Sequence, residues 1–146
     1  MKKAIIFLSF AGILVSCTES LNSISKRVFE LAAVQCTVMD SQLTDSTSAR
    51  TYTCQGDFVP SKLNWWCSGF FPGTLWYVYE WTGDEKIRVL AEKNTLKLAD
   101  VKACGSAHDL GFQYWCSYGN ALRITGDEKY KPAISQASEI LAARFN

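Results

Sequence analysis

A five-residue phrase, Thr-Gly-Asp-Glu-Lys, occurs twice in this chain, at Thr82–Lys86 and at Thr125–Lys129. The copies are 43 residues apart, a period typical of stacked helical hairpins. Within the phrase, glycine suits the left-handed position just past a helix, and aspartate suits the N-cap of the next helix. We therefore expect each copy to be the turn of a helical hairpin, and we expect the chain to be all-α.

The segments around the two copies share a hydrophobic pattern. Leu75–Trp81, before the first copy, is almost wholly apolar, which predicts a helix buried on most sides. After that copy, apolar residues recur on one helical face only, and the segments around the second copy repeat the arrangement. Each unit thus pairs an inner helix with an outer one. Pro132 requires the last helix to begin near Lys131 or to be less stable than its counterpart.

The region before the repeats is less regular. Residues 20–36 carry apolar side chains at helical spacing, which predicts an amphipathic helix. Ser41–Gln55 is rich in Ser, Thr and Asp with little periodicity, and no alternation indicates a strand. We expect residues 17–60 to be a helix followed by a polar connection, and residues 61–146 to be the helical domain.

Residues 1–16 predict an export signal. Lys2 and Lys3 precede an apolar run, Ala4–Val15, that is too short to span a bilayer. The sequence Leu-Val-Ser-Cys that ends this region resembles a bacterial lipobox. The resemblance implies cleavage before Cys17, lipidation of its thiol, and an exported protein held at the bacterial envelope by a lipid anchor alone. An ordinary signal peptide, or a buried N-terminal helix with an incidental cysteine, is the alternative.

Composition narrows the possible functions of this 146-residue, single-domain chain. Its net charge of +1 gives no electrostatic reason to expect a nucleic-acid partner. It has no Cys/His cluster with zinc spacing and no Gly-rich phosphate loop. Five cysteines remain besides Cys17, so they cannot all pair with one another, and the sequence does not select a disulfide. The abundant aromatic residues either fill the core or form platforms for sugars.

His108 and Asp109 are the candidates for chemistry. His108 is the only histidine, and the pair follows a Gly-Ser break and precedes an apolar helical stretch. One interpretation is structural: Asp109 caps the helix and His108 lies in a loop. The other is functional: Asp109 is a carboxyl group placed for proton transfer at the mouth of a helical barrel.

Several motifs resemble those of the unsaturated glucuronyl hydrolases, glycoside hydrolase family 88. They are Trp66–Tyr77 with Tyr79-Glu80 and Thr82-Gly83-Asp84, His108–Phe112 with Ser117–Arg123, and Leu141–Asn146. The resemblance runs from Trp65 to Asn146, while residues 21–60 match only loosely. It implies an (α/α)6 toroid of six inner and six outer helices, of which this chain would be the incomplete N-terminal part.

The resemblance also implies a substrate and a reaction. The substrate is an oligosaccharide, such as a glycosaminoglycan fragment, whose non-reducing end is a 4,5-unsaturated uronic acid left by a polysaccharide lyase. A carboxyl group protonates C4 and activates a water that adds at C5, and the resulting hemiketal collapses to release the sugar. No metal or organic cofactor is implied.

The implied site residues are Asp109, Trp66 and His108. Asp109 matches one of the family's two essential aspartates, which hydrogen-bonds the sugar and sets the charge state of the other. Trp66 would be a stacking wall and His108 a polar contact, although Trp66 can equally be a core residue and His108 a turn residue.

The second aspartate of the family lies farther downstream than these residues, so we expect the chain alone to be inactive. Two other classes of function stay open. One is a toroid enzyme of the unsaturated rhamnogalacturonyl hydrolase type, which acts on pectin fragments. The other is a non-catalytic lipoprotein that holds sugar through its aromatic residues.

Overall fold

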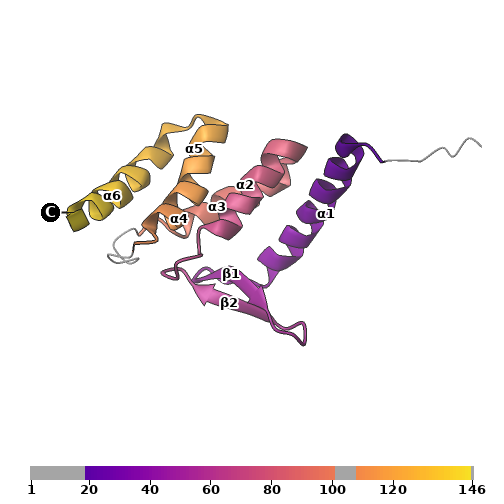
Figure 1. Cartoon of the computed structure of the whole chain (residues 1–146), viewed down its shortest axis with the longest axis horizontal. Coiled ribbons are helices and arrows are strands. Elements are labelled where there is room, and N and C mark those ends of the chain that lie inside the picture. Colours follow the sequence, from indigo (N-terminus) through magenta and orange to yellow (C-terminus); the bar gives the residue numbers. More distant parts are fainter. Residues whose placement is uncertain (1–18, 101–107, 146) are drawn as a thin grey trace, which may run out of the picture.

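The structure is a computed structural model that describes residues 19–100 and 108–145. Helices follow one another in chain order from α1 at one side to α6 at the other (Figure 1). The described elements are α1 (Leu21–Ser41), β1 (Thr47–Tyr52), β2 (Phe58–Lys62), α2 (Phe70–Thr82), α3 (Glu85–Leu96), α4 (Leu110–Tyr114), the π-helical turn η2 (Trp115–Gly119), α5 (Asn120–Thr125), the 3-10 turn η3 (Glu128–Tyr130), α6 (Lys131–Ala142) and the 3-10 turn η4 (Ala143–Phe145). The predicted helical fold is confirmed.

The predicted export signal, residues 1–16, and the predicted lipidation site, Cys17, lie outside the described residues. Within the described ranges, no helix is both long enough and apolar enough to cross a membrane.

The two copies of the repeated phrase have the same structure. Gly83 and Gly126 follow their helices in the left-handed conformation, with φ of 66° and 69°. Asp84 and Asp127 then accept a hydrogen bond from the backbone N–H two residues on, at 2.8 and 3.0 Å. Each copy therefore ends one helix and caps the next, as the sequence predicts.

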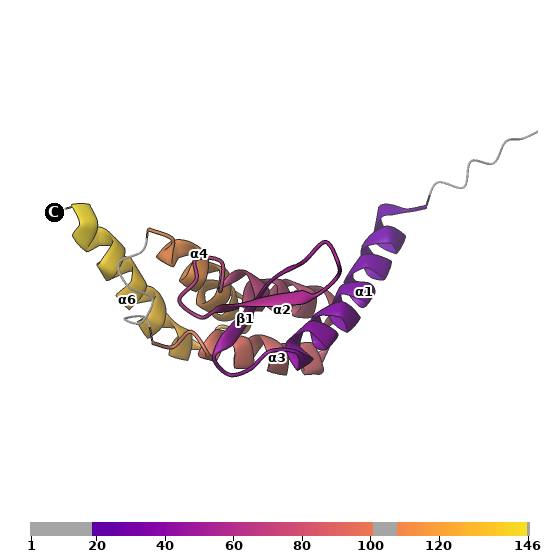
Figure 2. The ribbon, with the colours of Figure 1, turned by 90° about the horizontal axis from the view of Figure 1, so that it is seen from below.

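Inner and outer helices are joined through a buried aromatic centre. Trp76 of α2 is fully buried, and its indole Nε1 donates to Thr95 Oγ1 of α3 at 2.9 Å. Tyr114 of α4 is also buried, and its hydroxyl donates to the carbonyl of Leu98 at 2.8 Å. Seen from below, α3 lies to one side of α2 (Figure 2). The helix α2 is not covered on all sides, because Tyr77 on its open side is half exposed.

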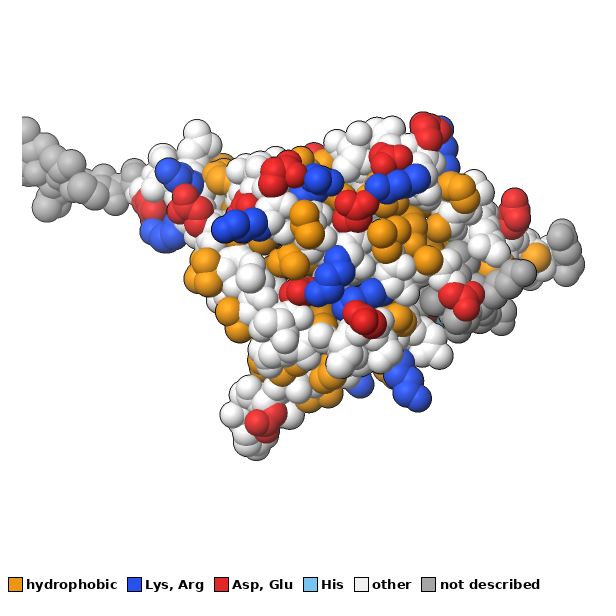
Figure 3. All heavy atoms as spheres, turned by 180° about the vertical axis from the view of Figure 1, so that it is seen from behind, with side chains coloured by type: hydrophobic (Ala, Val, Ile, Leu, Met, Phe, Trp, Pro, Cys, Tyr) orange, Lys and Arg blue, Asp and Glu red, His pale blue; other side chains and the backbone are white. Residues whose placement is uncertain are grey.

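The outer surface is that of a solvated helix. Arg88 of α3 forms ion pairs with Glu85 and Glu92. Glu92 also forms an ion pair with Lys129, in which Oε1 lies 2.6 Å from Nζ. Acidic and basic side chains accordingly lie side by side over the face seen from behind (Figure 3). Charged side chains of both signs are therefore mixed on this face.

The expected polar connection contains a β-hairpin, so that part of the prediction is wrong. Strand β1 pairs antiparallel with β2, and all of β1 falls inside Ser41–Gln55. The inward positions are taken by Ser48 and Ser61, which are buried. Ser48 Oγ donates to the carbonyl of Ser68 at 2.9 Å. Because serine satisfies these positions by hydrogen bonding, the strands lack the apolar alternation by which a strand is recognised.

Pro132 lies at the start of the last helix. Asp127 caps the short 3-10 turn η3, and α6 then begins at Lys131, so that the proline occupies the first turn. A proline there costs no helical hydrogen bond, because the first N–H groups of a helix have no intrahelical acceptor. The first of the two alternatives for this segment is therefore confirmed.

Helix α1 is tied to α3 by a buried carboxylate. Asp40 accepts from Lys93 Nζ at 2.8 Å and from Asn94 Nδ2 at 2.6 Å. The aspartate is buried and its partners come from the last turns of α3. Because Asp40 lies near the end of α1, shortly before β1, this contact fixes the start of the β-hairpin relative to α3.

Candidate active site

His108 and Asp109 lie directly before α4, at the end of that helix nearest the hairpin (Figure 1). Asp109 occupies the N-cap position, but its side chain makes no capping hydrogen bond. Its Oδ2 instead lies 3.2 Å from Nε2 of His108, and the Asp109 side chain is 18% exposed against 80% for His108. Asp109 thus occupies the cap position, but its carboxylate does not act as a cap. The carboxylate is partly shielded from solvent and points toward His108.

An aromatic cluster of Trp66, Phe70 and Phe112 surrounds the start of α4. The Trp66 ring meets Phe70 edge-on at 5.8 Å and Phe112 at 6.4 Å, and the two phenylalanines are 5.6 Å apart. Trp66 is 45% exposed and Phe112 50% exposed. The Phe112 N–H donates to the carbonyl of Asp109 at 2.9 Å, so the cluster and the carboxylate share one helix start. Trp66 is therefore a partly exposed ring in contact with Phe112 of α4 and not a core residue.

Gln113 fixes the turn that carries Trp66. This side chain is fully buried, and its Nε2 donates to the carbonyl of Trp65 at 2.9 Å and to Ser68 Oγ at 3.3 Å. The backbones of the two segments also touch, because a Cβ built on Gly69 would lie 2.2 Å from the carbonyl oxygen of Gln113. The relative position of Trp66 and α4 is thus set by main-chain packing as well as by side chains.

Sequence reasoning did not single out Gln113, Phe70 or Phe112 as site residues. A signal for Gln113 was present: an uncharged amide stands between Phe112 and Tyr114 in an apolar stretch. Buried amides are kept only where they find partners, so such a residue indicates a specific tertiary hydrogen bond.

A hollow of about 340 Å³ lies between α2 and the segment formed by η2 and α5. Beyond it, Arg123 donates to both carboxylate oxygens of Glu80 at 2.6 and 2.8 Å. This bidentate bond lowers the pKa of Glu80, so Glu80 stays ionised at neutral pH and is no proton donor there. The hollow is lined by Phe70, Gly73, Thr74, Tyr77, Trp115, Cys116 and Asn120.

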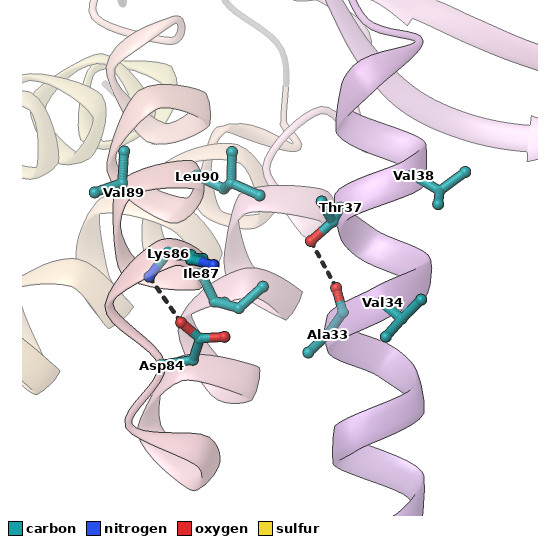
Figure 4. Close-up of a pocket in the computed structure, with 9 residues that line it drawn as sticks. All are labelled: Ala33, Val34, Thr37, Val38, Asp84, Lys86, Ile87, Val89 and Leu90. Atoms are coloured by element: carbon teal, nitrogen blue, oxygen red, sulfur yellow. Dashed lines mark hydrogen bonds between the residues drawn. The ribbon is translucent and has the colours of Figure 1, made fainter.

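A larger groove, of about 570 Å³, lies between α1 and α3 (Figure 4). Its walls are mostly aliphatic, and its one carboxylate, Asp84, is committed to capping α3. The Thr37 hydroxyl in this groove donates to the carbonyl of Ala33, one turn back in the same helix. The carboxylate of this groove is therefore not available for proton transfer, and Asp109 stays the candidate for chemistry.

The described cysteines are free thiols: Cys36, Cys54, Cys67 and Cys116. Burial raises the pKa of the thiols of Cys36, Cys67 and Cys116, which makes them poor nucleophiles. Cys67 lies in the turn before α2. Among the described side chains there is also no group of three His, Cys, Asp or Glu residues that could hold a metal ion.

Comparisons with known proteins fit this geometry. No family model matches the chain. The unsaturated glucuronyl hydrolase of Formosa agariphila is 42% identical over 89 residues, which are 60% of this chain and 22% of that protein. A crystal structure of an unsaturated glucuronyl hydrolase specific for heparin matches with a TM-score of 0.76 and 38% identity, over 83% of this chain and 33% of that one. The chain is homologous to part of the unsaturated glucuronyl hydrolases.

Two further relatives belong to the same group of hydrolases. The unsaturated chondroitin disaccharide hydrolase of Streptococcus agalactiae is 36% identical over 83 residues, 55% of this chain and 21% of that protein. A variant of the unsaturated glucuronyl hydrolase of Streptococcus agalactiae, crystallised with dGlcA-GalNAc6S, matches with a TM-score of 0.72 and 26% identity. That match covers 99% of this chain and 40% of that one. The helical hairpins described above therefore match a portion of the fold of these hydrolases. The segment of the chain that aligns with the curated relatives covers about a fifth of their length.

Proposed function

We propose that residues 65–145 form one side of the active site of an unsaturated glucuronyl hydrolase. The enzyme would release a 4,5-unsaturated uronic acid from the non-reducing end of an oligosaccharide made by a polysaccharide lyase. The observation that carries the proposal is that the Asp109 carboxylate makes no capping bond to its helix, while the backbone carbonyl of Asp109 accepts from the N–H of Phe112, whose half-exposed ring meets that of Trp66. A carboxyl group next to aromatic faces suits a sugar, which stacks on the rings while its hydroxyl groups bond to the carboxylate.

In the proposed reaction, Asp109 holds the sugar and acts on a second carboxyl group that donates the proton. The C4=C5 double bond takes that proton at C4, and the oxygen of a water bonds to C5 while its own proton returns to the carboxylate. The hemiketal then opens by cleavage of the bond between C5 and the ring oxygen, which gives a ketone at C5 and a hemiacetal at C1. The hemiacetal transfers its hydroxyl proton to the leaving oxygen as the C1–oxygen bond to the sugar breaks, and an aldehyde remains at C1. The negative charge of Asp109 raises the proton affinity of a neighbouring carboxyl group, which favours its protonated form near neutral pH. His108, which touches Asp109, would contribute a polar contact to the sugar.

We further propose a glycosaminoglycan as the source of the substrate. This rests on the relatives: one is named for unsaturated chondroitin disaccharide, and one solved structure is named as specific for heparin. An unsaturated chondroitin disaccharide is therefore the first substrate to test, with the corresponding pectin product beside it to represent a hydrolase of the rhamnogalacturonyl type.

A chimera tests the proposed function. The 89 matched residues of the Formosa agariphila hydrolase would be replaced with those of this chain. We expect the chimera to remove the ultraviolet absorbance of the C4=C5 double bond from the disaccharide. A chimera that folds and binds the disaccharide without consuming it would instead favour a non-catalytic sugar-binding role for these residues.

We also propose that the protein is exported and held at the envelope by a lipid on Cys17. The support is the order of Lys2-Lys3, an apolar run and Leu-Val-Ser-Cys at the start of the sequence. Cys17→Ser should move the protein from the membrane fraction to the soluble fraction of a bacterial expression host. If the wild type and Cys17→Ser divide between the two fractions in the same proportion, the lipid anchor on Cys17 is excluded.

A further inference from the structure

Arg50 is the extra residue of a β-bulge. In the hairpin, Ala49 pairs with Pro60 and Thr51 pairs with Val59, so Arg50 has no partner across the ladder. Proline has no N–H to donate, which interrupts the ladder at this point. A bulge bends its strand and changes the direction of the side chain it carries. The sequence thus gives Arg50 an orientation that regular pairing would not allow.

The redirected side chain stacks on Trp65. The guanidinium carbon of Arg50 lies 4.9 Å from the centre of the Trp65 ring, and Arg50 is exposed to solvent. When the flat face of a guanidinium stacks on an aromatic ring, its N–H groups, which point outward in the guanidinium plane, stay available as donors. They form a planar fork that matches the geometry of an oxyanion. The aromatic ring therefore restricts the cation without neutralising it.

Arg50 also differs from other arginines of the described structure in its charge environment. Arg27, Arg88 and Arg123 each pair with a glutamate. For Arg50, the part of the chain that the structure describes provides the Trp65 ring and no ion pair. A preoriented cation without a carboxylate partner is suited to an anion supplied from outside.

This cation lies at the same end of the helices as the candidate site. Trp65 is the neighbour of Trp66, and its carbonyl accepts the hydrogen bond from Gln113 in α4, the helix that starts after Asp109. The hairpin crosses the ends of the helices at this place (Figures 1 and 2). A saccharide that stacks on the aromatic cluster would therefore have Arg50 at its side.

We propose that Arg50, stacked on Trp65, binds an oxyanion of the saccharide, either a sulfate ester or a uronate carboxylate. This inference rests on the function proposed above, and it adds a residue that favours charged sugars over neutral ones. The bond is a charge-assisted, forked hydrogen bond, the geometry in which arginine recognises planar or tetrahedral oxyanions.

Calorimetric titration of the whole chain tests the inference with two probes, an unsaturated chondroitin disaccharide with and without a sulfate ester. Arg50→Met should lower the affinity for the sulfated disaccharide about tenfold, because one partly exposed charged hydrogen bond is lost. A loss confined to the sulfated probe identifies the sulfate ester as the bound group. An equal loss for both probes identifies the carboxylate.

Two control variants separate charge from geometry. Lys86→Met removes an exposed positive charge from the outer helix α3 and should leave both affinities unchanged. Arg50→Lys keeps the charge and loses the planar fork, so its affinity should fall between those of wild type and Arg50→Met. Unchanged affinities in Arg50→Met, with turnover of the disaccharide by the chimera described above, would overturn the role of Arg50 and leave the proposed function standing. Failure of the wild-type chain to bind either probe would overturn both.

Discussion

Gly69→Ala is expected to destabilise the protein by about 3 kcal/mol, because an added methyl group would overlap main-chain atoms that cannot rotate away. A Cβ at this position would lie 2.2 Å from the carbonyl oxygen of Gln113 and 2.5 Å from that of Phe112. Relief would require separating the turn that carries Trp66 from α4. The substitution should therefore also move Trp66 relative to Asp109 and weaken sugar binding in whatever protein remains folded.

Gly111→Ala is the matched control, since Gly111 lies in α4 itself. A Cβ there meets no atom within 4 Å, and alanine is a better helix former than glycine by up to about 1 kcal/mol. Denaturant unfolding of both variants measures the difference. Similar unfolding free energies for the two variants would mean that the close contact between the turn and α4 is not present in solution.

Asp109→Asn is expected to lower turnover of the unsaturated disaccharide by about 10² to 10⁴-fold in the chimera described above, the range of general acid–base contributions. Asparagine keeps the shape and much of the hydrogen bonding of aspartate. It cannot carry a negative charge, so it cannot adjust the proton affinity of a second carboxyl group. The effect should appear mainly in kcat, because the sugar still stacks on Trp66 and Phe112.

Asp127→Asn is the control for this substitution. Asp127 also stands at an N-cap, but its Oδ1 accepts from the Lys129 N–H at 3.0 Å, a bond that asparagine can make equally well. We expect turnover to stay at the level of the parent chimera. A similar loss in both variants would indicate a general effect on folding.

The helical architecture could be predicted because its determinants are local. Glycine past a helix end and aspartate at the next N-cap are requirements of backbone geometry, so the repeated phrase locates both turns at Gly83 and Gly126. The same holds for Pro132, whose missing N–H is tolerated only in a first turn. The homology to the unsaturated glucuronyl hydrolases then confirms the larger fold that the motifs indicate.

The hairpin and much of the site could not be predicted, because their determinants are tertiary. The inward positions of the strands are occupied by Ser48 and Ser61. Serine is a polar residue that is common in loops, so a sequence with serine at these positions does not indicate a strand. The bulge at Arg50 depends on which residue faces Pro60 across the ladder. At Asp109, residue type and position both favour a cap, and only the structure places the carboxylate against His108 instead.

The most direct test of the site is the rate at which the chimera and its Asp109→Asn variant remove the absorbance of the C4=C5 double bond. We predict turnover by the chimera, retention of that rate in Asp127→Asn, and a loss of at least about 100-fold in Asp109→Asn. An Asp109→Asn chimera that consumes the unsaturated disaccharide at the rate of its parent would contradict the assignment of Asp109 to the reaction.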